Sequence, residues 1–329
     1  MCDVPSLTVP SQKKRSGFAS CGSCAPLILL LTLTGSIRAA AQELEPRAYS
    51  ASPIGANFLL VGIVRSSGGV VFDPTVPVTD VHADINAATL GLGRTFNLAG
   101  RQALVTAALP YAWGDISGKV AEQAQNITRS GLADTRLKVS VNLWGTPALK
   151  PAEFFRQPPR TNIGASLSVA APSGQYLADK LINIGTNRWA FKPEVGLSHP
   201  KGRWWLELAS GVWLFASNDQ FYPGESLRTQ APLFVFQAHV SYNVTRRAWA
   251  AFDATWYGGA DVSVNDGPPM SRQNNTRLGG TLVLPAGARQ SLKIAYSTGA
   301  STRTGSDFST VAIAWQYLWF DRARPAATK

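Results

Sequence analysis

The chain has 329 residues, of which 45% are hydrophobic and only 16% are charged, and its formal net charge is +11 at pH 7. Soluble proteins usually contain about 25% charged residues. No run of about 18 uncharged apolar residues occurs, which excludes a helical membrane protein, and the high aromatic content argues against disorder. Two classes remain, a soluble all-β protein and a β-barrel whose apolar face meets lipid.

The N-terminal residues have the order of features found in a secretory signal peptide. A basic region at 13–15 precedes an apolar run at 25–37, and small residues follow at 39–41. This order predicts cleavage near Ala41, so that 1–41 is a signal peptide. The alternative is that the apolar run forms a buried strand or a short helix.

The three cysteines of the chain, Cys2, Cys21 and Cys24, all lie in this leader. The mature chain would therefore contain no cysteine, which excludes disulfides, thiolate metal sites and cysteine nucleophiles. An excess of basic over acidic residues can indicate a protein that binds nucleic acid. This chain, however, is predicted to be exported, and its Lys and Arg residues cluster only at Arg246-Arg247. We therefore expect no nucleic-acid partner, and expect acidic lipid headgroups or anionic solutes instead.

After the leader, apolar residues alternate with small or polar ones. In 136–143, for example, Leu137 and Val139 share one face, and Lys138 and Ser140 share the other. A helical period would scatter these residues over both faces, so the pattern predicts strands. About twelve such segments occur, near 57–64, 81–96, 102–114, 132–144, 161–171, 188–198, 204–215, 232–242, 248–258, 275–284, 290–299 and 308–319.

The connections between these segments alternate in length. Short turns are predicted at 97–100, 200–202, 243–247 and 285–287, and long loops at 65–80, 115–131, 172–187, 216–231 and 259–274. Short turns at one end and long loops at the other are typical of outer-membrane barrels. The proline-rich segment 145–160 is long where a short turn is expected. An even strand count places both termini in the periplasm.

The pattern predicts an all-β fold, a transmembrane antiparallel up-and-down β-barrel of about 12 strands over 42–320, followed by a short tail at 321–329. Aromatic residues gather near the strand ends, as they do at a lipid–water interface. The alternative is the core of a large soluble sandwich. The strand at 308–320 ends in Phe320 and resembles the C-terminal signal that the barrel-assembly machinery recognises, although a tail follows it.

Several blocks of the mature chain carry a resemblance to a known family. They lie at 171–176, 180–194, 230–232, 237–239, 258–259, 277–279, 290–293, 304–308 and 315–317, and Asn187-Arg188-Trp189 is the most specific of them. The chain resembles the outer-membrane barrel family named for the meta-cleavage pathway of phenol degradation, commonly labelled transporters. One departure is Gly131-Leu132-Ala133-Asp134, where a second Gly is expected before the Asp.

The resemblance implies a passive outer-membrane channel or uptake protein of a Gram-negative cell. Its solutes would be small compounds, with aromatic or hydrophobic ones as the class that the family name suggests. The alternatives are a structural or adhesive barrel whose loops bind a partner, and an outer-membrane lipid hydrolase. The best match to a Ser–His pair is His239 with Ser241, and the alternation points both inward, so no enzyme is expected.

The same alternation points a set of titratable side chains into the lumen, because a cation on the lipid face costs about 2–4 kcal/mol at the bilayer midplane. This set is Arg136, Lys138, Lys192, Glu194, Glu207, His239, Asp253, Arg277 and Lys293. They would either form a slightly cationic solute pathway that favours small anions, or pair with one another and brace the wall.

An apolar pocket near the outer mouth is predicted from Trp213, Phe215, Phe221 and Tyr222. The three histidines lie far apart in sequence and have no metal-ligand spacing. No glycine-rich phosphate motif follows a strand and opens a helix. We therefore expect neither a metal nor a cofactor, and expect lipid, a small solute and the assembly machinery as partners.

Overall fold

The computed structural model describes residues 45–71, 78–120 and 123–321. The predicted signal peptide at 1–41 and residues 322–329 of the predicted tail lie outside this part of the chain. The described residues form one short helix and sixteen strands: β1 (Ala56–Val71), β2 (Val78–Leu98), β3 (Arg101–Val120), β4 (Gln123–Leu132), β5 (Arg136–Trp144), α1 (Pro151–Phe154), β6 (Asn162–Ala170), β7 (Ala190–Lys201), β8 (Trp204–Phe215), β9 (Asn218–Phe221), β10 (Ser226–Gln230), β11 (Leu233–Asn243), β12 (Trp249–Gly259), β13 (Val262–Val264), β14 (Gln273–Pro285), β15 (Gln290–Ser301) and β16 (Gly305–Phe320).

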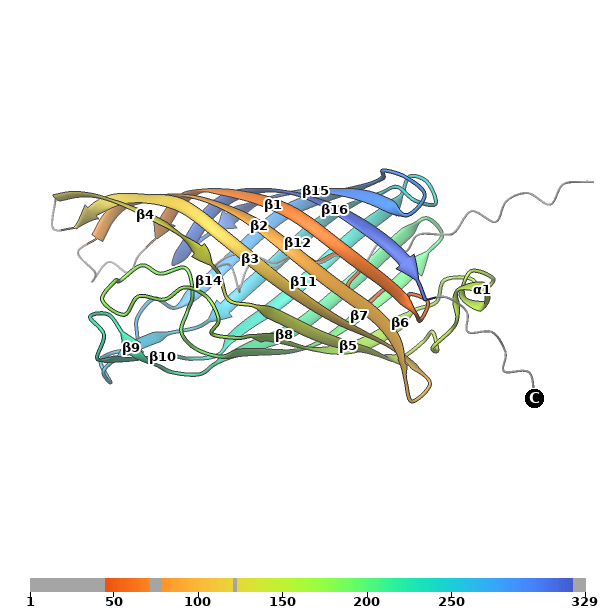
Figure 1. The fold of residues 1–329 in the computed structure, drawn as a ribbon, viewed down its shortest axis with the longest axis horizontal. Coiled ribbons are helices and arrows are strands. Elements are labelled where there is room, and N and C mark those ends of the chain that lie inside the picture. Colours follow the sequence, from red (N-terminus) through yellow and green to blue (C-terminus); the bar gives the residue numbers. More distant parts are fainter. Residues whose placement is uncertain (1–44, 72–77, 121–122, 322–329) are drawn as a thin grey trace, which may run out of the picture.

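The long strands close into one antiparallel barrel (Figure 1). Consecutive barrel strands pair with one another, except that β3 pairs with both β4 and β5, and β16 pairs with β1 from Ala56↔Phe320 to Val71↔Gly305. Every barrel strand except β4 is paired along both edges, as a lipid-embedded sheet requires. β4 pairs only with β3, toward the loop-rich end of the barrel. The barrel has twelve strands when β4 and β5 are counted as one, so the predicted all-β up-and-down barrel is confirmed.

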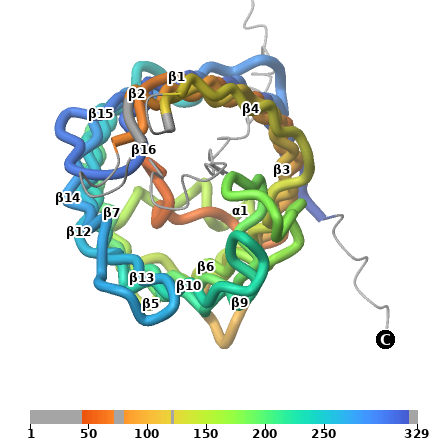
Figure 2. The backbone as a smooth tube through the Cα atoms, turned by 90° about the vertical axis from the view of Figure 1, so that its left-hand side faces the viewer, coloured from red at the N-terminus to blue at the C-terminus, as the bar shows by residue number. Residues whose placement is uncertain are grey.

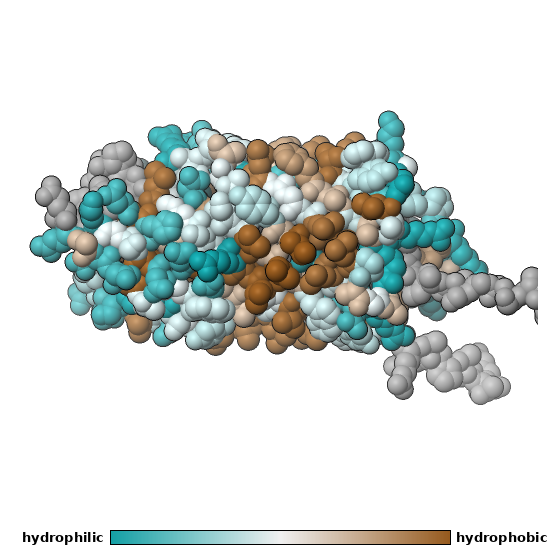
Figure 3. All heavy atoms as spheres, turned by 90° about the horizontal axis from the view of Figure 1, so that it is seen from above, coloured by the Kyte–Doolittle hydropathy of each residue, from teal (hydrophilic) through white to brown (hydrophobic). Residues whose placement is uncertain are grey.

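The alternation along the strands separates the two surfaces of the wall. In β8, Trp205, Glu207 and Ala209 are buried in the lumen, and Leu206 and Leu208 are exposed on the outside. On the face seen in Figure 3, hydrophobic residues are most frequent in the middle of the barrel, between more hydrophilic ends. The exposed apolar residues of the strands, such as Leu92, Leu206 and Phe252, form the apolar belt of the outer wall. This belt is the surface that the lipid tails would cover.

The two ends of the barrel differ in their connections. At the end where β1 begins and β16 ends, here called the turn end, short turns join the strands (Figure 1). Ala99 and Gly100 have φ values of 48° and 81°, as a two-residue hairpin requires. The 145–161 connection also lies at this end and contains α1, so it is long, as the sequence indicated.

At the opposite end, here called the loop end, two predictions were wrong. The segments 65–80 and 115–131 were expected to be loops, but β1 continues to Val71 and β3 and β4 pair as far as Val120↔Gln123. These extensions carry polar residues on both faces. They therefore lack the alternation of apolar and polar residues by which the lipid-embedded part of a strand is recognised in the sequence. In the predicted loops 216–231 and 259–274, β9, β10 and β13 form a small separate sheet.

The predicted strand 132–144 was also wrong in its extent. β5 pairs with residues 103–108 of β3, whereas β4 pairs with residues 111–120 of the same strand, so the fourth barrel strand is broken at 133–135. The 172–187 connection packs beside the break. The carboxylate of Asp134 accepts hydrogen bonds from Gly174 N at 3.0 Å, and from Thr186 N and Oγ1 at 3.0 and 2.6 Å.

Replacing this carboxylate is expected to release the 172–187 connection. Asp134→Ala removes three charge-assisted hydrogen bonds, each of which contributes about 1.5–3 kcal/mol. We expect trypsin to cleave the folded protein after Lys180 at least about tenfold faster, since cleavage follows local opening. The control is Asp115→Ala, whose exposed carboxylate accepts one bond from Thr128. Equal cleavage rates for the two variants would refute this role of Asp134.

Candidate functional site

Residues 45–55 do not belong to the wall but lie inside the barrel, and are here called the luminal segment. Figure 2, which looks along the barrel, shows this red-orange stretch of chain crossing the ring of strands. Arg47, Tyr49, Ser50 and Ser52 of this segment are all buried. The segment therefore fills part of the lumen, and the charged residues of the wall meet it rather than open water.

The first set of contacts joins the luminal segment to lysines and a glutamate of the wall. Lys138 Nζ lies 2.5 Å from Glu45 Oε2 and 3.9 Å from Glu194 Oε1, and Lys192 Nζ lies 3.0 Å from Glu194 Oε2. The Tyr49 hydroxyl donates to Glu194 Oε1 at 2.8 Å. Two cations and two carboxylates thus neutralise one another across the interior of the barrel, as buried charges must.

Arg47 makes the second set of contacts, toward β8, β11 and β12. Its Nε donates to Ser241 Oγ at 3.1 Å and its Nη2 to Asn243 Oδ1 at 2.7 Å. The guanidinium lies over the Trp249 ring, 4.4 Å from the centroid, and 5.2 Å from that of Trp205. Burial lowers the pKa of Arg47 to about 10 and the Glu207 carboxylate opposes this, so the side chain stays charged at neutral pH.

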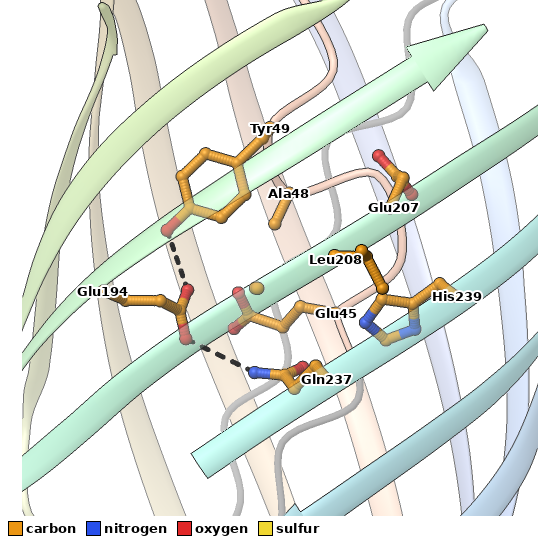
Figure 4. A pocket seen from close by; sticks show the side chains of 9 residues that line it. Glu45, Ala48, Tyr49, Glu194, Glu207, Leu208, Gln237 and His239 are labelled. Carbon is orange, nitrogen blue, oxygen red and sulfur yellow. Dashed lines mark hydrogen bonds between the residues drawn. The ribbon is translucent and has the colours of Figure 1, made fainter. Parts of the chain in front are cut away.

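A small polar pocket lies between the luminal segment and the wall (Figure 4). Glu207 in this pocket accepts hydrogen bonds from Ser198 Oγ at 2.8 Å, from Ser50 Oγ at 3.1 Å and from the Arg47 backbone N–H. The side chains that line it include Glu45, Tyr49, Glu194, Glu207, Gln237 and His239.

His239 belongs to a short chain of polar contacts that starts at this pocket. Its Nδ1 lies 2.7 Å from Asp253 Oδ1, and Thr281 Oγ1 donates to Asp253 Oδ2 at 2.8 Å. The strand register brings them together, because His239 pairs with both Glu207 and Asp253. Asp253 holds the histidine in place, so the contact orders the wall.

Two of the remaining predicted residues, Arg277 and Lys293, make no hydrogen bond to this network in the part of the chain that the structure describes. Arg277 Nη2 donates to Ser297 Oγ at 3.1 Å and to Phe308 O at 2.8 Å. Lys293 is buried in the lumen, and its ammonium makes no hydrogen bond within the described residues. Arg136 is half-buried next to the break in the fourth strand. The structure thus joins six of the nine predicted side chains through these contacts, and Arg277 and Lys293, as described, make no hydrogen bond to them.

Glu45, Arg47 and Tyr49, which organise the site, were not predicted from the sequence. The segment 45–55 shows no alternation of apolar and polar residues. The spacing of Glu45, Arg47 and Tyr49 is also found in ordinary loops, so it does not indicate a site. The one signal of the segment is its position directly between the predicted cleavage site and the first strand. Only the partners on β5, β7, β8 and β11 make these residues part of a site.

The predicted apolar residues divide into two pairs. Trp213 is only 1% exposed and packs in the lumen with Leu233, Val235 and Tyr257, and Phe215 lies against them. This group, completed by Ala170, Ala190 and Ala260, is here called the apolar luminal cluster. Phe221 is half-buried in β9, and Tyr222 is exposed beside it, so neither belongs to the cluster.

Cations flank the apolar luminal cluster. Lys192 Nζ lies 5.5 Å from the centre of the Trp213 ring, and the Arg188 guanidinium lies 4.6 Å from that of Phe215. Such contacts are favourable between a cation and an aromatic face. The cluster follows Glu207 by six residues along β8, so it lies nearer the loop end than the charged network does.

The proposed hydrolase pair has the wrong surroundings for that chemistry. Ser241 faces the lumen, where its hydroxyl accepts from Arg47, and His239 is held by Asp253. Neither side chain reaches the lipid surface, where a phospholipid ester would lie. Among residues 45–71, 78–120 and 123–321, no group of three or more His, Cys, Asp or Glu side chains is arranged to hold a metal ion.

Comparisons with known proteins agree with this architecture. The model of the family described as "Putative MetA-pathway of phenol degradation" matches residues 65–317. No curated protein matches the chain. Among solved structures, the chain is similar to an outer membrane channel from Pseudomonas putida F1, with a TM-score of 0.70, 20% identity, and coverage of 84% of this chain and 100% of that one. It is also similar to the transport unit of the autotransporter AIDA-I from Escherichia coli, with a TM-score of 0.45, 13% identity, and coverage of 80% and 90%.

Proposed function

The chain belongs to the family named for the MetA pathway of phenol degradation, and from this we propose that it is a passive outer-membrane channel for small compounds, aromatic or hydrophobic ones among them. The barrel has the fold of outer-membrane channels. Short turns in such barrels face the periplasm, so the turn end would be the periplasmic one.

One observation supports a channel most strongly, namely that a separate piece of chain fills the lumen. In residues 45–50 of the luminal segment, the main-chain bonds from Ala48 N to Glu45 O and from Ser50 N to Arg47 O stay within the segment, whereas Ile54 N and Gly55 N at its end donate to Leu149 O and Thr95 O outside it. Its contacts with β5, β7 and β8 run through side chains, such as Tyr49 to Glu194. Residues 45–50, which are held in this way, can move without breaking the barrel, because the strand ladders do not depend on them.

The apolar luminal cluster supports aromatic or hydrophobic solutes. On its way from the loop end a solute would come to Trp213 and Phe215, whose rings stack with centroids 6.4 Å apart. Trp213 is only 1% exposed, so the packing around it would have to open before the solute reached the ring. The solute would then meet the charged network and the luminal segment. An aromatic surface followed by a polar barrier would favour compounds that combine an apolar ring with a polar group. The barrel would thus take up small amphipathic molecules.

The solute proposal predicts that aromatic compounds bind at Trp213. In a barrel that lacks the luminal segment and conducts ions, phenol should block the current, and Trp213→Ala should raise the half-blocking concentration about two- to tenfold, since one aromatic contact contributes about 0.5–1.5 kcal/mol. The measurement is the single-channel current during a phenol titration from the loop-end side. Trp204→Ala is the matched control, because this Trp lies on the same strand and faces outward.

Three outcomes of this titration are informative. Weaker block by Trp213→Ala alone supports the proposed pathway. If phenol blocked Trp213→Ala and Trp204→Ala at the same concentration, Trp213 would not belong to the solute pathway. A barrel that conducts no ions with or without the luminal segment would point to the structural or adhesive alternative instead.

We also propose a route by which the chain is exported and assembled. The leader at 1–41 would direct the chain to the periplasm, where the strand at 308–320 would serve as the assembly signal. In β16, Trp315, Tyr317 and Trp319 share the outer face, with neighbouring ring centroids 6.2 and 5.8 Å apart. This continuous aromatic ridge is the feature that the assembly machinery would bind, and residues 321–329 would follow it as a tail.

A further inference from the structure

The exposed charges of the barrel are distributed unequally between its two ends. At the turn end, in 94–101, 145–161, 200–204, 243–249, 285–290 and at 321, ten residues are basic and two are acidic. At the loop end, in the described residues of 65–85, 114–131, 172–187, 217–231, 260–274 and 301–307, seven are basic and nine are acidic. The basic residues at the turn end are Arg94, Arg101, Lys150, Arg156, Arg160, Lys201, Arg203, Arg246, Arg247 and Arg289.

The charges at the loop end largely pair with one another. Lys119 lies 2.7 Å from Asp80, Arg65 lies 3.4 Å from Asp84, and Arg272 lies 3.6 Å from Asp261. At the turn end, Arg94 lies 2.7 Å from Asp321. The positive charge of the turn end therefore remains largely uncompensated by the protein.

Five of these cations gather on three neighbouring turns and are here called the basic turn patch: Lys201, Arg203, Arg246, Arg247 and Arg289. The turns adjoin because β8 pairs with β11 and β12 pairs with β14. Arg203 Nε donates to Asn243 O at 2.8 Å, and Arg247 donates to Gly287 O, which ties each turn to the next. None of the three turns contains an acidic residue.

Three of the five cations have free side chains. Among the described residues, Lys201, Arg246 and Arg289 are exposed and their side chains make no hydrogen bond or ion pair. The guanidinium groups of Arg203 and Arg247 donate some of their hydrogen bonds to main-chain carbonyls of the turns. The patch therefore combines a fixed scaffold of two arginines with three cations that are available to a ligand.

The wall below the basic turn patch is aromatic and then aliphatic. Trp204 is 51% exposed on the outer face, its ring centroid lies 4.8 Å from that of Tyr242, and the Arg203 guanidinium lies 4.9 Å from the Tyr242 centroid. Leu206 and Leu284 continue this face toward the middle of the belt. Aliphatic, aromatic and cationic groups in this order match the acyl chains, the interface and the phosphate of a phospholipid.

We propose that the basic turn patch binds the headgroups of anionic phospholipids in the leaflet that faces the periplasm. This inference rests on the membrane location and orientation proposed above. Each basic residue near an anionic membrane surface contributes about fivefold in affinity at low ionic strength, so several together select anionic over zwitterionic lipid. Bound lipid would also fix the depth of the barrel, because the phosphates lie at one level of the membrane.

The test measures which lipids stay bound to the purified barrel. The protein is equilibrated with equal amounts of phosphatidylglycerol and phosphatidylcholine of the same acyl chains, and retained lipid is counted by native mass spectrometry. We expect wild-type protein to retain phosphatidylglycerol preferentially. The triple variant Lys201→Gln, Arg246→Gln, Arg289→Gln should lose this preference at least about tenfold, since three charges are removed.

The matched control removes the same charge from the loop end, through Arg65→Gln, Lys119→Gln and Arg303→Gln, and should keep the preference. Heat-modified gel mobility confirms that both variants are folded. Equal retention by the two triple variants would overturn the proposal. The proposal would also be overturned if soluble glycerol phosphate displaced the lipid completely, because the patch would then bind a free anion. Binding of a peptidoglycan fragment without any lipid preference would overturn it as well. Conductance is recorded in parallel, so that failure of the channel proposal is seen separately.

Discussion

Removal of the luminal segment is expected to open the barrel to ions. A chain that lacks residues 45–53 should form channels with several-fold larger single-channel conductance in planar bilayers than the full chain, because the segment fills the lumen next to the charged network. Arg47→Ala with Tyr49→Ala should increase the frequency of openings. This double variant loses two hydrogen bonds of Arg47, its two aromatic contacts and the Tyr49 bond to Glu194.

The control for this prediction is Phe155→Ala with Arg156→Ala. These residues follow α1 in the connection at the turn end, and they also pair an aromatic ring with an arginine. The control should conduct like the wild type. If the deletion left the conductance unchanged, the luminal segment would not be the barrier, and the permeability of the barrel would depend on the wall alone.

The largest loss of stability is expected from Lys192→Met. The side chains of Lys192 and Glu194 are 1% and 2% exposed, and their charged atoms lie 3.0 Å apart. Methionine fills a similar volume but leaves Glu194 with Lys138 at 3.9 Å and the Tyr49 hydroxyl. Breaking a buried pair costs about 3–5 kcal/mol, and we expect a loss of about 3 kcal/mol because these partners remain. The measurement is urea unfolding in lipid vesicles, followed by gel mobility.

Two further variants separate the loss of the pair from the loss of packing. The double variant Lys192→Met, Glu194→Gln should recover most of the lost stability, because no uncompensated charge stays buried. Lys180→Met removes an exposed pair with Asp179, whose side chains are 47% and 68% exposed, and should change stability by less than about 0.5 kcal/mol. A Lys192→Met protein as stable as Lys180→Met would show that water reaches the pair.

Much of the fold could be predicted because a barrel wall is periodic. A residue of β8, β11 or β15 meets either lipid or lumen according to whether its number is odd or even, so the alternation shows both that these segments are strands and which way each side chain points. This reasoning placed Glu207, His239 and Asp253 in the lumen. The predicted segment 204–215 has the bounds of β8 itself.

The errors occur where the lipid no longer imposes this period. The extensions of β1 to Val71 and of β3 and β4 to the Val120↔Gln123 pair stand beyond the apolar belt, with both faces polar, so their sequence resembles a loop. The break in the fourth strand is held by Asp134 and the distant 172–187 connection. Hydrogen bonds between residues about forty to fifty positions apart leave no local pattern to read.

The sequence alone therefore establishes the wall of this protein, its strand number and the inward direction of its charged residues, since all three follow from one alternation repeated along the chain. The tertiary structure decides what the charges do. Lys138 meets Glu45, Glu194 meets Tyr49 and Glu207 meets Ser50 because the luminal segment folds back into the barrel. That placement depends on contacts with several strands at once, which become adjacent only when the barrel has closed.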